Sequence, residues 1–308
     1  MPAIAEDIRS IPAILRRTYA RVDEHRAALA PLLGGPVALL GSGSSYCVAM
    51  AAAATYEGAR HAPAQAIIAS DYLPRPGWTH IAISRTGQTT ELIDTMARAR
   101  AAGAPVLLVV GEEGSPAARH ADALLPLEFA AEQNVIQTRF VVASVEALRS
   151  LTAGQGKGEG EGGEATGLPS AIARALDLFD PTPLERFDHV VFLGRGAGQG
   201  LARAAAVNLQ ETALLTPEAH HTLDYRHGPI AAADGDTLVW CLDAPGDAAS
   251  AAVLDDVRKT GATVFGLTDE PLAALAQVQL YSLHKAQARG IDPTTPRNLS
   301  RAIILDHS

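Results

Sequence analysis

The chain has 308 residues, of which 47% are hydrophobic and 19% are charged, and its formal net charge is −9. This length predicts two domains, each large enough for its own hydrophobic core. The negative charge and the lack of a Lys/Arg run argue against nucleic-acid binding, but backbone N–H groups, hydroxyls and a helix N-terminus can still hold a phosphate.

The first half of the chain alternates helical and strand patterns. Residues 4–32 place isoleucine and leucine at helical spacing, which predicts a helix. Residues 36–43 form an apolar run that ends in glycines, and an alanine-rich helical stretch follows. Strands are predicted at residues 79–84 and 104–111, with a helix between them, and a further helix is predicted over 135–154.

Residues 154–167, GQGKGEGEGGEATG, interrupt this pattern and predict a flexible linker or a disordered loop. The pattern then restarts with a strand and glycine turn at 187–198, an alanine-rich helix, a strand at 236–242, another helix and a strand at 263–269. Strands that alternate with helices indicate parallel sheets covered by helices on both faces. The predicted fold class is therefore α/β, with doubly wound sheets.

The two halves resemble copies of one unit. Residues 40–43, LGSG, match residues 193–196, LGRG, and alanine triplets follow both at the same offset. A duplication explains this better than one long sheet, although two unrelated α/β domains could share such patterning. We expect a first domain with its N-terminal helix over 1–153, a second domain over 168–295, and a C-terminal tail over 296–308.

Hydroxyl-rich loops follow the first two predicted strands, where doubly wound sheets bind their ligands. The first is Gly41-Ser42-Gly43-Ser44-Ser45, which lacks the third glycine of a dinucleotide fingerprint. The second, residues 84–91, has four hydroxyls. Thr86 or Thr89 could simply cap the next helix, and the glycines could simply make tight turns. Four hydroxyls exceed what a cap needs, so we expect the two loops to hold one phosphate.

Glu211 and His227 are the candidate proton-transfer residues. Glu211 lies on the predicted helix of the second domain, and His227 precedes Gly228-Pro229, where a helix would stop. A carboxylate and an imidazole could share proton transfers, one next to a carbonyl and one at a ring oxygen. The alternative is that each is a surface or structural residue. The spacing of His220, His221 and His227 does not fit a metal site, and we expect neither a metal nor another cofactor.

The start of the chain predicts the compartment. Its first twenty residues carry acidic side chains and lack the apolar core of a signal peptide, and no window reaches the roughly 18 apolar residues of a membrane span. Cys47 and Cys241 fit neither a disulfide framework nor a metal-type spacing. We therefore expect a cytoplasmic protein without a membrane segment.

Taken together, these motifs resemble proteins built from two sugar isomerase (SIS) domains, such as the isomerase part of glucosamine-6-phosphate synthase and stand-alone aminosugar-phosphate deaminase/isomerases. The resemblance covers nearly the whole chain. It rests on six motifs in the family's order: DIRSIPAIL (7–15), GSSY (43–46), SRTGQT (84–89), FLGRG (192–196) with Glu211 on the helix after it, RHGPI (226–230), and PRNLSRAIILDHS (296–308).

The resemblance implies a fold of two tandem flavodoxin-like αβα sandwiches and a role for each matching residue. Glu211 would be the base that moves a proton between C1 and C2, and His227 would assist ring opening, reaching in from the other subunit of a homodimer. Val135, through its backbone, and Thr138 would line the sugar, and the tail with Arg301 would fold over it. The phosphate and neighbouring hydroxyls would be bound by Ser44, Ser45, Ser84, Arg85, Thr86 and Thr89.

Two departures from the family bear on the chemistry. Asn208 stands where the synthase has a lysine three residues before its catalytic glutamate, and Arg301 replaces the lysine of the tail. A guanidinium stays protonated and is a poor Schiff-base nucleophile, so amine chemistry through that lysine is not expected. No glutamine-hydrolysing domain is visible, so glutamine-dependent synthesis by this chain alone is not expected either.

The expected function is an aldose–ketose isomerase, an aminosugar-phosphate deaminase, or both, acting on a hexose or hexosamine 6-phosphate. A deglycase for fructosyl-amine 6-phosphates would use the same base on another substrate. A sugar-phosphate sensor without catalysis is the alternative from a different class. Glu211 and His227 favour an enzyme.

Overall fold

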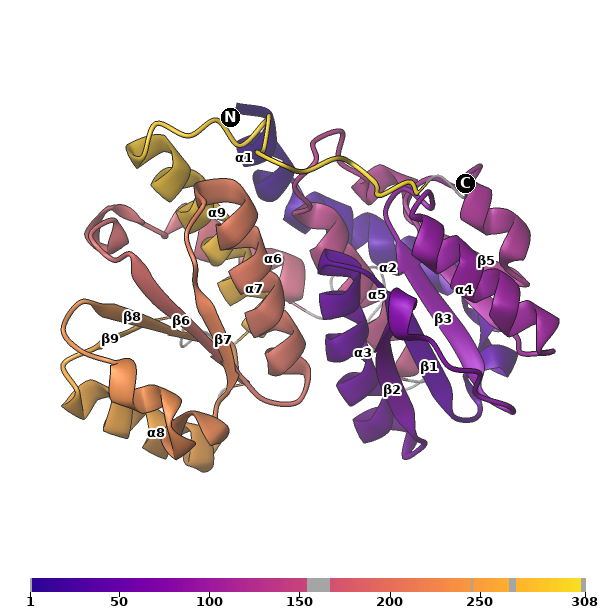
Figure 1. The fold of residues 1–308 in the computed structure, drawn as a ribbon, viewed down its shortest axis with the longest axis horizontal. Coiled ribbons are helices and arrows are strands. Elements are labelled where there is room, and N and C mark those ends of the chain that lie inside the picture. Colours follow the sequence, from indigo (N-terminus) through magenta and orange to yellow (C-terminus); the bar gives the residue numbers. More distant parts are fainter. Residues whose placement is uncertain (1, 154–166, 245, 266–269, 306–308) are drawn as a thin grey trace.

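The computed structural model describes residues 2–153, 167–244, 246–265 and 270–305. These ranges form two α/β units side by side, with helices of both units between the two sheets and α4 (Thr90–Ala101) and α8 (Ala248–Lys259) on the outer faces (Figure 1). Three sequence predictions extend into residues outside this description: the linker, for all but Gly167, the second half of the strand expected at 263–269, and the last three residues of the tail expected over 296–308. In the described part, no helix has the length and apolarity needed to cross a bilayer.

The first sheet is parallel, with strand order β2-β1-β3-β4-β5. This is the flavodoxin-like order, so the predicted doubly wound fold is confirmed. Alternate residues of its buried strands pack in opposite directions: Leu39 and Ile81 belong to the core on the side of α2, α3 and α5, whereas Leu40 and Ala82 pack with α4 on the other side. The element bounds are β1 (Val37–Gly41), β2 (Ala64–Ile68), β3 (Thr79–Ser84), β4 (Val106–Val110), β5 (Ala123–Pro126), α2 (Ile11–Leu29), α3 (Ser44–Arg60), α4 (Thr90–Ala101) and α5 (Arg139–Thr152).

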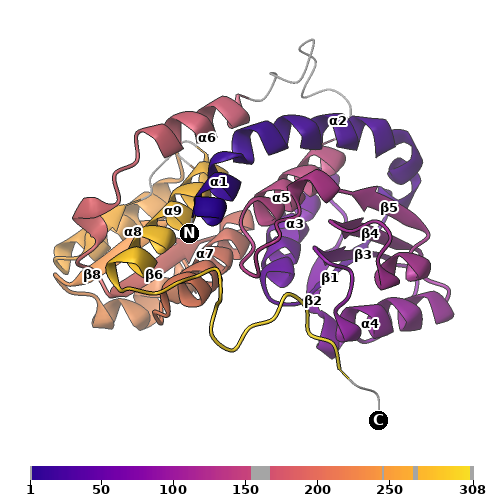
Figure 2. The same ribbon diagram turned by 90° about the horizontal axis from the view of Figure 1, so that it is seen from above.

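The second sheet, in the described ranges, has the order β7-β6-β8-β9 and is also parallel. Helix α8 covers its outer face, while α6, α7 and α9 face the first domain. Figure 2 shows these inner helices and those of the first domain filling the space between the sheets. The bounds are β6 (His189–Gly194), β7 (Glu218–His221), β8 (Thr237–Cys241), β9 (Thr263–Phe265), α6 (Leu168–Asp177), α7 (Ala197–Ala213), α8 (Ala248–Lys259) and α9 (Pro271–Ala288).

Three elements differ from the sequence prediction. The helix expected over 4–32 divides into α1 (Pro2–Arg9) and α2, with Pro12 in the first turn of α2, because proline cannot donate a backbone hydrogen bond inside a helix. Strand β7 and helix α9 were not predicted. Helix α9 is buried on most of its surface, so its sequence has only a weak amphipathic period.

The β1-α3 and β6-α7 units share their backbone conformation, which supports the predicted duplication. Helices α3 and α7 are both 17 residues long. Gly43 and Gly196, which precede them, both have φ 54°. His61 and Leu214, which follow them, are both left-handed, with φ 52° and 54°. Two unrelated domains would have no reason to share these details.

Helices α3 and α7 meet at Gly200, and this contact joins the two domains. A Cβ atom at Gly200 would stand 2.7 Å from the carbonyl oxygen of Cys47 and would overlap the backbone nitrogen of Ala51. Small side chains let the two backbones approach this closely. The main core cluster consequently runs through both domains without interruption.

Gly200→Ala should therefore destabilise the protein, because the added methyl forces the two helices apart. Overpacking of a close contact costs about 1–3 kcal/mol. Gly58→Ala is the matched control, since Gly58 is an exposed α3 residue whose added Cβ would meet nothing within 4 Å. This control should stabilise the helix by about 1 kcal/mol or less. Urea unfolding of both variants checks this, and equal midpoints would contradict the close contact.

Candidate active site

Two glycines shape the turn between β1 and α3. A Cβ atom at Gly41 would lie 2.5 Å from the backbone carbon of Ser45, and Gly43 has φ 54° with ψ −128°. A residue with a side chain fits neither position. The tight turn places Ser42 and Ser45 beside the start of α3, where the helix dipole favours an anion.

The loop between β3 and α4 contains its own hydrogen bonds. Ser84 Oγ accepts a hydrogen bond from the Gly87 N–H at 2.9 Å, and Thr86 Oγ1 accepts one from the Gln88 N–H at 3.3 Å. Thr89 is the N-cap residue of α4, yet within the described chain its side chain makes no capping hydrogen bond. The capping explanation for Thr89 is therefore wrong, and its hydroxyl remains available to a ligand.

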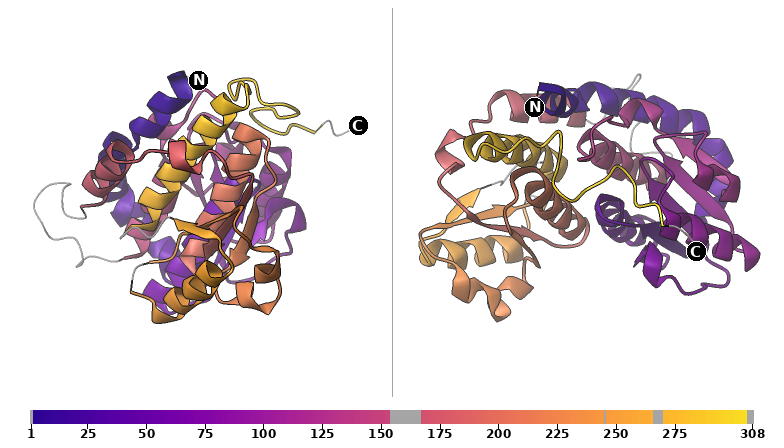
Figure 3. Two further views of the ribbon diagram at one scale, coloured as in Figure 1. Left: turned by 90° about the vertical axis from the view of Figure 1, so that its left-hand side faces the viewer. Right: turned by 45° about the horizontal axis from the view of Figure 1, so that its top comes forward.

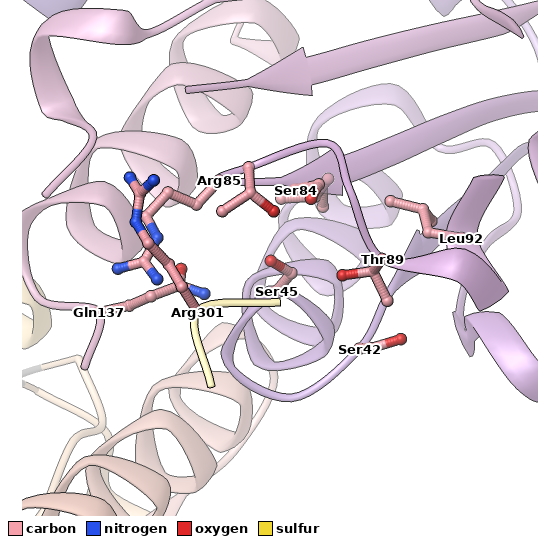
Figure 4. A pocket seen from close by; sticks show the side chains of 10 residues that line it. Ser42, Ser45, Ser84, Arg85, Thr89, Leu92, Gln137 and Arg301 are labelled. Carbon is pink, nitrogen blue, oxygen red and sulfur yellow. The ribbon is translucent and has the colours of Figure 1, made fainter. Parts of the chain in front are cut away.

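These two loops border one polar pocket at the carboxyl ends of β1 and β3. Figure 4 shows the Thr89 hydroxyl pointing toward Ser45, while the guanidinium groups of Arg85 and Arg301 lie together beside Gln137. Ser44 is half-buried and does not line this pocket, although Ser42, its neighbour in the loop, does. The lining residues are Ser42, Ser45, Ile83, Ser84, Arg85, Thr86, Thr89, Leu92, Gln137 and Arg301.

Arg85 holds the segment before α5 in place. Its side chain is only 2% exposed, and its two terminal nitrogens donate to the carbonyl oxygens of Asn134 and Val135 at 2.7 and 2.9 Å. It also pairs with Glu132, which is 0% exposed, at 3.5 Å. The Val135 carbonyl, expected to face a sugar, thus already accepts a hydrogen bond from Arg85. The Arg85 Nε has no partner among the described residues.

Glu132 is a central residue of the site that sequence reasoning missed. Its Oε1 accepts hydrogen bonds from the backbone N–H and the hydroxyl of Thr138, at 2.7 and 3.1 Å, and from the Phe140 N–H at 2.9 Å. It therefore caps α5 while pairing with Arg85. The Thr138 hydroxyl is committed to this network. Only its position six residues before Thr138, ahead of a predicted helix, could have suggested a capping role.

The C-terminal tail crosses from the second domain to the first (Figure 3). Arg301 pairs with Glu112 at 2.7 Å and donates to the carbonyl oxygen of Glu132 at 2.9 Å. Further along, the Ile303 carbonyl accepts a hydrogen bond from the Thr90 N–H at 3.1 Å, and the Leu305 N–H donates to the Thr90 hydroxyl at 2.9 Å. The tail thus lies against the first turn of α4 and contributes Arg301 to the pocket.

Glu211 lies on α7 of the second domain, near the pocket but outside its lining. Desolvation by burial raises the pKa of Glu211 from 4.5 to about 7, and the charge of Arg85 opposes this shift. Arg85 is a pocket residue, so the carboxyl group lies within reach of the pocket's field. One turn earlier on α7, the Asn208 amide donates to the Gln137 carbonyl oxygen at 3.5 Å. A carboxyl group with a pKa near neutrality can both accept and release a proton.

His227 is exposed at the end of a short 3-10 helix, Asp224–His227, and does not line the pocket. Gly228, with φ 151°, follows it. Within one chain, Arg301 therefore lines the hydroxyl pocket and His227 does not.

Other chemistries find little support in the described ranges. No group of three His, Cys, Asp or Glu side chains there could hold a metal ion. Burial raises the pKa of the Cys47 thiol to about 12, so the thiol stays protonated and is not a candidate nucleophile. The hydroxyls, the two arginines and Glu211 are the groups that remain.

Sequence comparison finds relatives of the chain among glutamine–fructose-6-phosphate aminotransferases (isomerizing). The chain is 26% identical over 316 residues to the glutamine–fructose-6-phosphate aminotransferase (isomerizing) of Caulobacter vibrioides, covering 88% of this chain and 52% of that protein. The corresponding protein of Symbiobacterium thermophilum is 28% identical, over 73% of this chain and 44% of its own. The chain thus spans about half the length of the curated relatives it matches.

Solved structures share the fold. Glucosamine-6-phosphate deaminase of Thermotoga maritima superposes with a TM-score of 0.80 at 23% identity, covering 98% of this chain and all of that chain. Tagatose-6-phosphate ketose/aldose isomerase of Escherichia coli gives 0.80 at 19% identity, with 95% of each chain covered. A model of the SIS domain matches residues 36–153 and 184–295, so the chain belongs to the SIS domain family and contains two tandem SIS domains.

Proposed function

We propose that the protein is an aldose–ketose isomerase, an aminosugar-phosphate deaminase, or both, and that its substrate is a hexose or hexosamine 6-phosphate. The observation that carries this proposal is the combination of a hydroxyl pocket at two helix N-termini with a partly buried carboxyl group whose pKa is about 7. The names of the relatives and of the structural neighbours point to the same class of substrate. We place the reaction in the cytoplasm, as expected from the sequence.

The phosphate would bind where α3 and α4 begin. Ser42, Ser45, Ser84 and Thr89 supply hydroxyls there, and the N-terminal dipoles of both helices favour an anion. Ser44 and Thr86 belong to the same loops. Arg301 brings a positive charge, although Glu112 partly neutralises it. The sugar would then extend toward Gln137 and α7, with the Val135–Thr138 segment on one side.

Glu211 would carry the proton transfer. Its carboxylate takes a proton from the carbon beside the carbonyl of the open-chain sugar, leaving an enediolate, and returns it to the former carbonyl carbon, while the hydroxyl proton passes from one oxygen to the other. No bond to the protein is required. With Asn208 and Arg301 in place of the family's lysines, we assign no Schiff-base step to this chain. Release of ammonia from an aminosugar would therefore proceed without a lysine adduct.

His227 would assist ring opening from the second subunit of a homodimer. Within its own subunit His227 is exposed and outside the pocket, which fits a role in the partner's site. An imidazole can protonate a ring oxygen at neutral pH. The homodimer is part of the proposal.

Ser84→Ala combined with Thr89→Ala should weaken binding of fructose 6-phosphate. Each lost hydrogen bond to a charged phosphate costs about 1.5–3 kcal/mol, so calorimetry should find affinity lower by more than tenfold. Thr55→Ala with Ser70→Ala is the control, because it removes two hydroxyls of the same domain that lie outside the pocket. Equal affinity in both double variants would remove the 84–89 loop from the phosphate site.

Glu211→Gln should retain sugar-phosphate binding but lose at least about 10²-fold in turnover, the usual contribution of a general base. In D₂O, the native protein should incorporate deuterium at C1 or C2, and the variant should not. For the native protein, kcat/KM should rise with pH through about 7, because only the ionised carboxyl group is a base. Tight binding without any exchange by the native protein would identify it as a sensor.

Stability measurements distinguish loss of a base from misfolding. Glu211 has a pKa of about 7 in the folded state, above the ordinary value of 4.5 for a glutamate, so the native protein should lose stability as pH rises between these values. The Glu211→Gln variant has no carboxyl group at this position, so its stability should not fall over this pH range. Its thermal midpoint should match the native one below about pH 4.5 and exceed it above pH 7. A midpoint below the native one at pH 8 would show that the carboxylate has a structural role.

Hybrid dimers test the placement of His227. Glu211→Gln and His227→Ala should each be inactive alone, whereas coexpression should restore part of the turnover, since one site of the hybrid dimer has both native residues. Light scattering should give a dimer at micromolar concentration. A monomer, or hybrid dimers without any recovered activity, would exclude action from the partner subunit.

A further inference from the structure

The second domain contains a structural counterpart of the hydroxyl pocket. Gly194 repeats the constraint of Gly41, because an added Cβ would overlap the backbone four residues later in both places. Arg195 therefore corresponds to Ser42. In the first sheet Leu40 pairs with Ala82, and in the second Leu193 pairs with Cys241. Two residues further along, the same register makes Asp243 the counterpart of Ser84.

Asp243 accepts hydrogen bonds from the groups that surround this second position. Its Oδ1 accepts from the Arg195 backbone N–H at 2.6 Å. Its Oδ2 accepts from the hydroxyls of Thr222, at 2.7 Å, and Ser250, at 2.6 Å. The side chain is 8% exposed. A backbone N–H of a strand–helix turn and two hydroxyls are donors of the kind that the first domain offers to an anion, although Thr222 and Ser250 stand where the first domain has Ala69 and Leu92.

A second carboxylate, that of Asp247, pairs with the nearby Arg195 guanidinium and caps the N-terminus of α8. Asp247 is the N-cap residue of α8, the counterpart of Thr89 before α4, and it accepts a hydrogen bond from the Ala249 N–H at 3.1 Å. Its other oxygen pairs with the Arg195 guanidinium at 2.6 Å. At these two positions the first domain has hydroxyls that a ligand could contact. The second domain has two aspartates, whose carboxylates accept hydrogen bonds from groups of the chain itself.

We infer that the second domain retains an anion site of the same design as the first, and that Asp243 occupies it permanently in place of a phosphate. Each chain therefore binds one sugar phosphate, in the first domain, and that location rests on the proposed function. Without its two carboxylates, the second site would bind a tetrahedral oxyanion. The second domain thereby supplies α7 with Glu211 to the first site and binds no second substrate.

The test replaces both carboxylates with the residues of the first domain, as Asp243→Ser with Asp247→Thr. This variant should bind one more inorganic phosphate per chain than its parent by calorimetry. Phosphate should also raise its thermal midpoint more than that of the native protein. Asp243→Asn with Asp247→Asn is the control, because it removes both charges but keeps the site filled, and it should gain no phosphate.

The same pair of substitutions in the Ser84→Ala, Thr89→Ala background separates the two proposals. If the first pocket is not a phosphate site, the native chain binds no phosphate at all. The two aspartate substitutions should still add one bound phosphate per chain. No added phosphate in a folded variant would overturn the inference. A variant that unfolds without phosphate and recovers its circular dichroism in phosphate supports it, and one that stays unfolded in phosphate overturns it. Two phosphates bound by the native chain would also overturn it.

Discussion

The contact between α3 and α7 determines how the two domains can work together. Gly200 lets the backbones meet at Ala51 and Cys47, where any side chain would keep them apart. The inner helices of both sheets then form one core, and α7 lies beside the loops of the first domain. Asn208, on the same helix, reaches the Gln137 carbonyl, and Glu211 feels the charge of Arg85. A site composed of hydroxyls from one domain and a carboxyl group from the other depends on this close approach.

Burial of the polar groups around the pocket explains its electrostatics. Arg85 and Glu132 are both withdrawn from water, and such a pair is tolerated only when additional hydrogen bonds satisfy the two ions. Backbone carbonyls on one side and the N-terminus of α5 on the other provide them. The pair thereby fixes the segment before α5, where the Gln137 carbonyl accepts the hydrogen bond from Asn208 of α7. Desolvation also raises the pKa of the partly buried Glu211, because the Arg85 charge offsets it only in part.

The two domains share one backbone design, but the side chains on it serve different purposes. Their strand–helix turns match in glycine conformation and register, yet the residues on them differ in chemistry. In the first domain, hydroxyls at these positions leave room for a ligand. In the second, Asp243 bonds to the turn and the neighbouring hydroxyls, which satisfies the donors within the chain. Under the proposed function, duplication followed by such a change leaves the phosphate site to the first domain, and the second domain contributes α7.

The sequence alone determined the fold class, the repeat and the two hydroxyl loops, because glycine turns and strand–helix alternation are local patterns. The 79–84 strand and the loop after it lie where the sequence predicted them. The roles of individual residues were decided by tertiary contacts between distant segments. Glu132 meets Arg85 across 47 positions, and Arg301 reaches its carbonyl oxygen across 169. No local pattern records such partners, so sequence reasoning missed Glu132 and could not foresee that Arg85 binds the chain's own carbonyls. Helix α9 was missed for a related reason: burial from several sides removes the amphipathic period that identifies a helix in a sequence.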